Sequence, residues 1–415
     1  MRRSHGIGIG VMCALACGAL AVAHRSPAGA FTGTIVVGVG PQEIAVDTRI
    51  GHAIVVNTGG DSVSVLDTHS GALVRTVPVA PSPLEVAVDT RTSRAVVVNS
   101  QGDVSVLDTT SGAVLRTFNI EPSVGGMDLC DVVVAARTNR FLVVMGNGDT
   151  PSILTFLDAR TGAVLRQTPV GRYAHTVAVD ERVGRVFTAN INDSTVSVLD
   201  LASGRVLRTV GVRAGPQEVA VDERTGRAFV TDADGSVSVL DTRDGSVIRT
   251  VAVAGNPTEL GVDAATGRVF VLLNPGVCTL DARTGAGLRT VAVGNTPAGA
   301  SVHNPLDIVV DARTSRVFVT ELNDAVSVLD ARNGRVLRRL PAGPGPVALA
   351  LDEANGRLLA VNPVGGDPRD ARRTTWAGWA WVPQGLRRWL PWLASPAPAP
   401  LTSTGGITVL DTSYL

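Results

Sequence analysis

The chain has 415 residues, of which 45% are hydrophobic and 18% charged, and its 37 basic residues balance its 37 acidic ones. This composition excludes an intrinsically disordered chain, because disorder requires low hydrophobicity and a large net charge. The zero net charge and the absence of a basic tract also argue against nucleic-acid binding, which relies on clustered positive charge.

Residues 1–30 are typical of an export signal that precedes a mature domain at 31–415. Two arginines near the start are followed by an apolar, Gly/Ala-rich run and by small-residue cleavage sites ending at Ala23 and Ala30. The apolar run is shorter than the roughly 20 residues that a spanning helix prefers. We therefore expect a cleaved signal and an exported protein, either periplasmic or at the cell surface, with lipidation at Cys17 as the alternative.

A repeated unit, exemplified by residues 219–253, occupies almost the whole mature chain. Each unit contains two landmarks, a short apolar run that ends in Asp and a VSVLD-like run. The first landmark ends at Asp47, Asp89, Ala135, Asp180, Asp222, Asp263, Asp311 and Asp352. The second landmark ends at Asp67, Asp108, Asp158, Asp200, Asp241, Asp281, Asp330 and Asp411. The spacing of roughly 41–50 residues is close to that of propeller blades.

Each unit offers four strands, written IAVD, AIVVN, VSVLD and ALVRTV within residues 44–76. Val, Ile, Leu and Thr dominate them, turn clusters separate them, and no helical periodicity is present. The pattern predicts an all-β protein, a single β-propeller of eight four-stranded blades, with seven blades as the alternative. The last unit lacks a fourth strand after 407–415, and the orphan strand at 32–40 can supply it and close the ring.

The second strands carry a family resemblance. They read IVVN at 54–57, VVVN at 96–99, FTAN at 187–190, FVTD at 229–232 and FVTE at 318–321. Together with VSVLD and the Asp-x-Arg-Thr-Gly turns, they resemble the YVTN-type β-propeller repeat of exported, surface-layer-like proteins. The resemblance implies a secreted, usually non-enzymatic binding or cell-surface protein.

Loop lengths distinguish the two faces of the predicted ring. The turns between strands 1 and 2 and between strands 3 and 4 are nearly constant, and they define the lower face. The insertions at 121–130, 295–305 and 363–406 all fall on the opposite, upper face. Insertions confined to one side of a repeat protein commonly mark its binding face.

Carboxylates recur where the chain enters the innermost strand of each blade on the upper face. Four residues before each first landmark stand Glu43, Glu85, Asp131, Thr176, Glu218, Glu259, Asp307 and Ala348. Their six carboxylates should surround the mouth of the central channel, and they are candidate ligands for Ca²⁺ or Mg²⁺. The alternative, which we favour, is that each acid bonds to backbone or to an arginine of the neighbouring blade.

Two other residue types bear on chemistry. His175 is the one histidine that the repeat places at the mouth, so it is the candidate catalytic residue, although a packed or solvated histidine is the more common occurrence. Cys130 and Cys278 fall in different blades, on different strands, so a disulfide between them is not expected.

The insertion at 363–406 contains all five tryptophans of the chain. Its candidate ligand-binding residues are Trp376, Trp379, Trp381, Arg387, Arg388, Trp389 and Trp392. Five buried Trp side chains represent on the order of 1,000 Å², more than the largest apolar patch of a typical monomer. We expect this arm to pack on something, as a lid or docking arm, as part of the propeller rim, or against a membrane surface.

Two functions are compatible with these features. The first is a non-catalytic binding or scaffold module at the cell envelope, a monomer that recognises an envelope protein, a peptide or a glycan through its upper face without a cofactor. The second is a divalent-metal-dependent hydrolase, resembling a lactonase, with its metal at the channel mouth. The sequence contains neither G-x-S-x-G nor H-E-x-x-H, so we favour the binding module.

Overall fold

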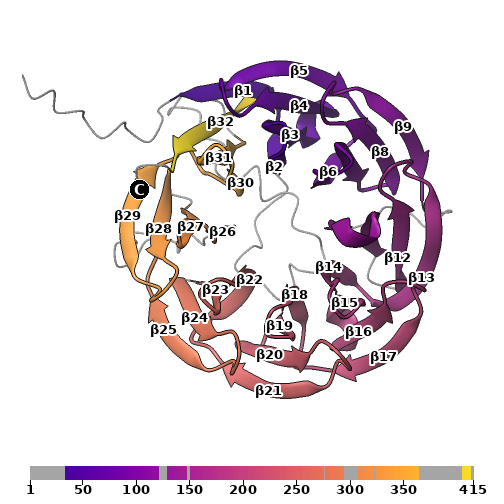
Figure 1. The fold of residues 1–415 in the computed structure, drawn as a ribbon, viewed down its shortest axis with the longest axis vertical. Coiled ribbons are helices and arrows are strands. Elements are labelled where there is room, and N and C mark those ends of the chain that lie inside the picture. The colour runs from indigo at the N-terminus through magenta and orange to yellow at the C-terminus, as the bar shows by residue number, and fades with distance from the viewer. Residues whose placement is uncertain are drawn as a thin grey trace, which may run out of the picture.

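The computed structural model describes residues 33–120, 129–146, 150–274, 276–293, 307–321, 324–363 and 404–412. Within these residues the chain forms eight four-stranded antiparallel sheets, arranged as blades of one ring (Figure 1). The eight-bladed propeller is therefore confirmed, and the alternative of seven blades is wrong.

The first four blades each use four consecutive strands. Blade one has β2 (Pro41–Asp47), β3 (His52–Asn57), β4 (Ser62–Asp67) and β5 (Ala72–Pro78). Blade two has β6 (Pro83–Asp89), β7 (Arg94–Asn99), β8 (Asp103–Asp108) and β9 (Val114–Asn119). Blade three has β10 (Leu129–Ala135), β11 (Arg140–Gly146), β12 (Pro151–Asp158) and β13 (Val164–Arg172). Blade four has β14 (Ala174–Asp180), β15 (Arg185–Asn190), β16 (Thr195–Asp200) and β17 (Val206–Gly211).

The next three blades repeat this arrangement, and the eighth combines both ends of the chain. Blade five has β18 (Pro216–Asp222), β19 (Arg227–Asp232), β20 (Ser236–Asp241) and β21 (Val247–Ala252). Blade six has β22 (Asn256–Asp263), β23 (Arg268–Asn274), β24 (Gly276–Asp281) and β25 (Gly287–Val291). Blade seven has β26 (Ile308–Asp311), β27 (Arg316–Glu321), β28 (Ala325–Asp330) and β29 (Val336–Pro341). Blade eight has β30 (Ala348–Asp352), β31 (Arg357–Asn362), β32 (Thr404–Asp411) and β1 (Thr34–Val39). Short 3₁₀ turns lie at Thr58–Gly60, Ala136–Thr138 and Ile191–Asp193.

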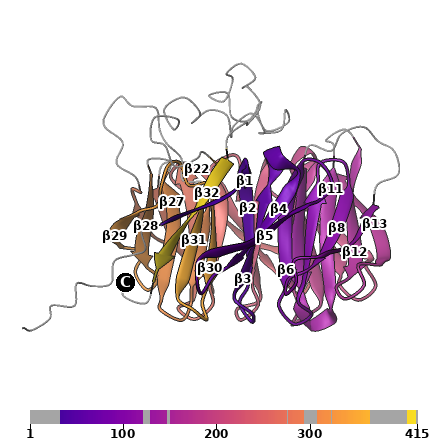
Figure 2. The same cartoon turned by 90° about the horizontal axis from the view of Figure 1, so that it is seen from above.

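The first strand of every blade is the innermost and the fourth lies on the rim (Figure 1). In the side view the strands cross the thickness of the ring, so their turns lie on its two faces (Figure 2). The fourth strands expose apolar side chains to solvent, for example Leu115 and Leu207. The first three strands of a blade are mostly buried, because each blade is covered on both sides by its neighbours.

The hydrophobic core consists of eight clusters that lie between adjacent blades. One cluster joins Val96 and Val98 of blade two to Phe141 and Val143 of blade three. Such packing follows from the period of two along a strand, which presents alternate side chains to the two neighbouring blades. No blade has a complete core of its own, so stability depends on the closed ring.

The ring closes where β1 pairs with β32. Ile35 lies opposite Ile407, and Thr34 lies opposite Thr408, with a bulge between Val36 and Val39. Val37 is buried in the cluster between blades eight and one, whereas Val36 is 61% exposed. The pairing predicted between the first and last strands of the sequence is confirmed.

On the lower face, the buried landmark carboxylates of the inner strands hold the tight 1–2 turns. Asp47 accepts a hydrogen bond from the backbone N–H of Arg49, and Asp89 accepts one from that of Arg91, at 3.2 and 3.0 Å. These bonds are the Asx-turn type expected of an Asp at this place.

Asp47 and Asp89 each also receive a hydroxyl, from one of two sources. Thr92, in the turn of blade two, donates to Asp89 of the same blade at 2.9 Å. Blade one has no Thr in that turn, and Asp47 instead accepts from Thr109 of the next blade at 2.6 Å. Where the blade's own turn supplies the hydroxyl, the next blade can have a side chain that donates nothing, as at Ala159. Blades one and two are thus complementary at this position, whereas Asp180 of blade four and Thr412 of blade eight each keep a buried oxygen that has no partner among the described residues.

Candidate functional site

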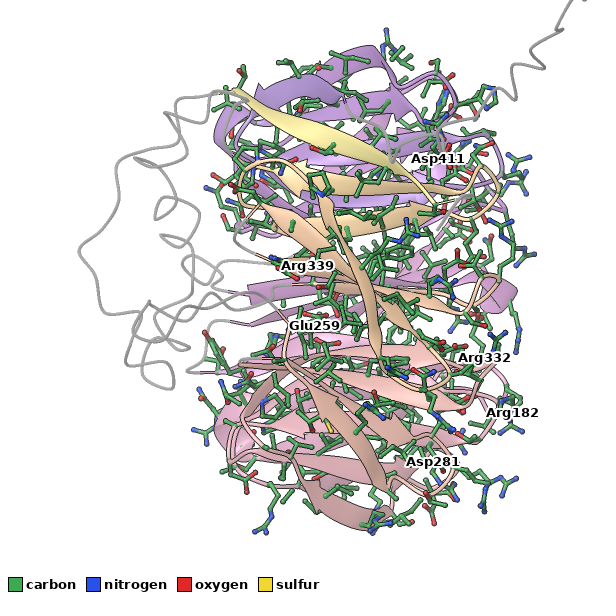
Figure 3. The ribbon with its side chains drawn as sticks, turned by 90° about the vertical axis from the view of Figure 1, so that its left-hand side faces the viewer. Arg182, Glu259, Asp281, Arg332, Arg339 and Asp411 are labelled. Carbon is green, nitrogen blue, oxygen red and sulfur yellow. The ribbon has the colours of Figure 1, made fainter. Side chains whose placement is uncertain are left out.

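The inner strands bring the predicted carboxylates to one end of the ring. Glu43, Glu85, Asp131, Glu218, Glu259 and Asp307, which we call the acidic ring, stand at or near the starts of β2, β6, β10, β18, β22 and β26. All six side chains are partly buried. Figure 3 shows Glu259 towards the end of the ring opposite Arg182 and Arg332, which belong to lower-face turns. Blades four and eight have Thr176 and Ala348 at the equivalent position.

Local backbone geometry orients the ring positions. The pairing of strands 1 and 2 shifts register between Pro41 and Glu43 in blade one, and between Pro83 and Glu85 in blade two. A bulge of this kind bends a strand and re-aims a side chain. The proline that precedes it has no N–H, so it fits the place where regular pairing stops.

The four glutamates of the acidic ring have raised pKa values, which favour their protonated, neutral form. Burial raises the pKa of Glu43 to about 8, and the negative charges of Asp307 and Asp131 raise it further. Burial also raises the pKa of Glu85, Glu218 and Glu259 well above the ordinary range, and carboxylates of other blades add to the shift. Because these acids act on one another across blades, they form one electrostatic unit.

The two aspartates of the acidic ring differ from the glutamates. Burial raises the pKa of Asp131 and of Asp307 to about 6, and backbone N–H groups hold it down. Asp131 accepts a hydrogen bond from the N–H of Val177 at 2.8 Å, and Asp307 accepts one from that of Leu349 at 2.5 Å. Both donors belong to the next blade. These bonds to a neighbouring blade are what the structural interpretation of the ring predicts.

The acidic ring is a poor fit to a metal centre in the geometry observed. Among the residues that the structure describes, no three His, Cys, Asp or Glu side chains are grouped closely enough to hold a metal ion. A Ca²⁺ or Mg²⁺ site would require these carboxylates to move towards one ion and lose their protons. The six metal candidates therefore stay a prediction that no observed contact supports.

His175 lies beside the acidic ring on β14. Burial lowers its pKa to about 4, which keeps the imidazole neutral at neutral pH. Its Nε2 atom is buried and has no hydrogen-bond partner within the described ranges. A general base works best with a pKa near the operating pH, so this environment does not tune His175 for that role. Its candidacy as a catalytic residue stays a prediction.

The remaining candidates divide between described and undescribed residues. Cys278 is buried on β24 as a free thiol. The Trp-rich arm lies outside the described residues, as do the export signal and most of the other two insertions. In the described part of the chain, no helix has the length and apolarity required to cross a membrane.

A second pair of buried acids was missed by sequence reasoning. At the end of the second strand, where blades one and two have Asn57 and Asn99, blade five has Asp232 and blade seven has Glu321. Burial raises the pKa of Asp232 to about 7, and Asp234 adds to the shift. Glu321 is instead paired with Arg339. The sequence shows these acids as a change at the last residue of the second strand, from Asn in IVVN to Asp in FVTD and Glu in FVTE.

The raised pKa of Glu43 predicts a pH-dependent stability. Between the ordinary value of 4.5 and the folded value of about 8, the folded chain binds a proton that the unfolded chain has lost. The free energy of unfolding therefore falls as the pH rises through this window. We expect Glu43→Gln to raise the melting temperature at pH 9 and to change it little at pH 5, as measured by circular dichroism. An equal shift at both pH values would show that the substitution acts through packing and not through charge.

The fold and the acidic ring define a closed β-propeller whose inner strands carry a ring of carboxylates. A family model described as outer membrane protein assembly factor BamB matches residues 45–206 and 192–364. The two matches together cover more than three quarters of the sequence, so the chain belongs to this family. A propeller repeat family is thereby confirmed, whereas the specific resemblance to YVTN-type repeats stays a prediction.

Solved structures show the same fold at low sequence identity. The computationally designed protein Ika8 has a TM-score of 0.64 and 16% identity, over 80% of this chain and 96% of that one. BamB from Moraxella catarrhalis has a TM-score of 0.59 and 16% identity, over 79% and 95%. Sqt1 from Saccharomyces cerevisiae has a TM-score of 0.65 and 11% identity, over 80% and 95%. No curated protein matches the sequence significantly. At these identities the structural likeness establishes the fold alone.

Proposed function

We propose that this protein is an exported, non-catalytic binding module of the cell envelope, which takes a positively charged segment of a partner protein at its acidic ring. The observation that carries the proposal is the gathering of six carboxylates from six blades, which repel one another in the absence of a cation. A cationic group would relieve that repulsion and allow the glutamates to ionise. Family membership supports a role in the envelope, since its name refers to outer-membrane protein assembly.

The surroundings of the acidic ring favour a side chain over a bare ion. Two residues further along the inner strands stand Ala45, Ala87 and Ala220 and, in blade six, Gly261. Side chains two residues apart on a strand share one face, so small apolar groups follow the carboxylates towards the lower face. Ala87 and Gly261 are buried, whereas Ala45 and Ala220 are half-buried and suit the aliphatic stem of an arginine or lysine whose charged end meets the acids.

The Trp-rich arm is proposed as the second contact with the partner. The described strands that flank it are β31 and β32, the second and third strands of blade eight, and their connected ends are on the face that has the acidic ring. Its tryptophans and its paired arginines, Arg387 and Arg388, suit a large apolar or glycan surface. Deletion of 366–400 should weaken capture of an envelope partner without weakening binding of a short basic peptide.

Binding of a fluorescent tetra-arginine peptide, measured by anisotropy, tests the central claim. We expect the combined variant Glu43→Gln, Glu218→Gln and Glu259→Gln to bind at least about tenfold more weakly, because the desolvated charges that contact the peptide are lost. The affinity should also fall with salt, since charge attraction is screened.

A matched control uses three glutamates of the lower face. The combined variant Glu181→Gln, Glu223→Gln and Glu353→Gln makes the same number of Glu-to-Gln changes, but these lie in the 1–2 turns. It should leave the affinity nearly unchanged. Equal losses in both triple variants, or no binding to the unmodified protein, would refute the proposal. Ca²⁺ or Mg²⁺ found by elemental analysis and lost only from the ring variant would instead support the metal-dependent hydrolase.

A further inference from the structure

The residue type at the acidic-ring position of the inner strands repeats after four blades. Starting from blade one, two glutamates are followed by one aspartate and by a position without an acid, and then the series begins again. The aspartates Asp131 and Asp307 are therefore half a turn apart, in blades three and seven. Each of them immediately precedes a blade whose own rim residue, Thr176 or Ala348, has no carboxylate.

The hydrogen bonds of the two aspartates cross to those acid-free blades. Asp131 accepts from the N–H of Val177, the residue after Thr176, at 2.8 Å. Asp307 accepts from the N–H of Leu349, the residue after Ala348, at 2.5 Å, and from its own neighbour Ile308 at 2.6 Å. The two contacts are equivalent, although they lie in opposite quarters of the ring.

Backbone satisfaction explains why the aspartates occur where they do. In blade one the N–H after the rim position, that of Ile44, is taken by Glu43 of the same blade at 3.0 Å. A blade with an alanine at the rim has no side chain for this purpose. The hydroxyl of Thr176 donates to the carbonyl of Gln217, and the N–H of Val177 goes to Asp131 instead. A buried N–H left without an acceptor is unfavourable, and the shorter Asp of the preceding blade supplies that acceptor.

We propose that Asp131 and Asp307 are positioning residues, latches that fix blades four and eight to their predecessors, and that the ligand-facing groups are two glutamate pairs half a turn apart. The pairs are Glu43 with Glu85 and Glu218 with Glu259. The assignment of the pairs to a ligand rests on the proposed function, whereas the latches do not.

Amide hydrogen exchange tests the latches. Two substitutions of Asp131 separate the effect of its charge from the effect of its side-chain length. Asp131→Glu keeps the charge, but a longer side chain is expected to turn to its own backbone as Glu43 does. Asp131→Asn loses the charge but keeps an oxygen that can accept from Val177. We expect exchange of the Val177 amide to accelerate by about tenfold or more in Asp131→Glu and to stay within about threefold in Asp131→Asn. Leu349 should respond in the same way to substitutions of Asp307.

Glu85→Gln is the matched control, because it alters the acidic ring outside the two latches. It should leave both amides unchanged. If the Val177 amide were equally protected in Asp131→Glu and in the unmodified protein, the latch would be disproved. Faster exchange of the Val177 amide in Asp131→Asn than in Asp131→Glu would also disprove the latch. The charge at position 131, and not the length of the side chain, would then protect this amide.

Affinity for the tetra-arginine peptide tests whether the glutamates, and not the aspartates, contact the ligand. We expect Asp131→Asn to weaken binding by less than about threefold and Glu218→Gln to weaken it several times more, because only the glutamate faces the ligand. Equal losses would overturn the assignment of the glutamate pairs. If the unmodified protein failed to bind the peptide at all, the proposed function would be refuted, and the exchange experiment would still decide whether the latches exist.

Discussion

Val37→Asp is expected to destabilise the folded ring by about 4 kcal/mol or more, because a carboxylate would be forced into an apolar interior without a partner. Val37 is 4% exposed and packs in the cluster that joins blades eight and one. The substitution lies on β1, so it should release the one strand that the start of the described chain contributes to the last blade. Thermal unfolding and size-exclusion chromatography should show a lower melting temperature and self-association through the exposed edge of β32.

The neighbouring residue provides the control. Val36 is 61% exposed on the other face of the same strand. Val36→Asp should therefore change the free energy of unfolding by no more than about 0.5 kcal/mol. If both variants were equally unstable, the charge would be acting on β1 in general and not on the buried closure. If both were stable, the pairing of β1 with β32 would contribute little to the ring.

Arg339→Ala is expected to cost about 1–3 kcal/mol, because the carboxylate of Glu321 loses the donors of the guanidinium, while the exposed position of Arg339 lets water screen part of the loss. The carboxylate of Glu321 is 2% exposed, and it accepts hydrogen bonds from Arg339 and from Ser327. Without the guanidinium, its charge would be left in the interior of blade seven. Denaturant unfolding at pH 8 should show the loss, and Arg338→Ala, one residue away on the exposed rim, should be close to neutral.

A second substitution should rescue the first. Blade one shows that Asn fits the position of Glu321, since Asn57 donates to Ser62 and Ser64 at 3.2 and 3.0 Å. Adding Glu321→Asn to Arg339→Ala removes the unpaired charge and restores a donor to Ser327. Most of the lost stability should return. If the double variant were no better than Arg339→Ala alone, the arginine would be acting through its packing and not through the ion pair.

The architecture is largely predictable from sequence, because each blade repeats the same pattern of strands and turns. The run of Val, Ile and Leu with turn residues at fixed places defines four strands, and the mismatch between the orphan strand at Thr34–Val39 and the incomplete last unit predicts the closure. The periodicity can be recognised within each unit, and a propeller consists almost entirely of such units.

The candidate site is predictable in place but not in detail. Spacing from the landmark residues identified Glu43 and Asp131 as equivalent, yet their contacts differ, because one bonds to its own backbone and the other to the next blade. Such contacts join residues about one repeat apart, and no single unit encodes them. Asp232 and Glu321 were overlooked for the same reason, since their importance lies in burial and in the presence or absence of an arginine.

The hydroxyl that some lower-face carboxylates receive from the next blade has a consequence for how such a chain can evolve. Thr109 of blade two serves Asp47 of blade one, whereas Ala159 of blade three follows a blade that already has Thr92. A blade without this hydroxyl, moved into the place of blade two, would leave Asp47 without its donor. The blades look interchangeable in sequence, but blades one and two are matched to their predecessors through Thr68 and Thr109. Recombination within this gene should therefore preserve these matched neighbours, so that a run that contains both partners, and not one of them alone, is the unit that can be exchanged.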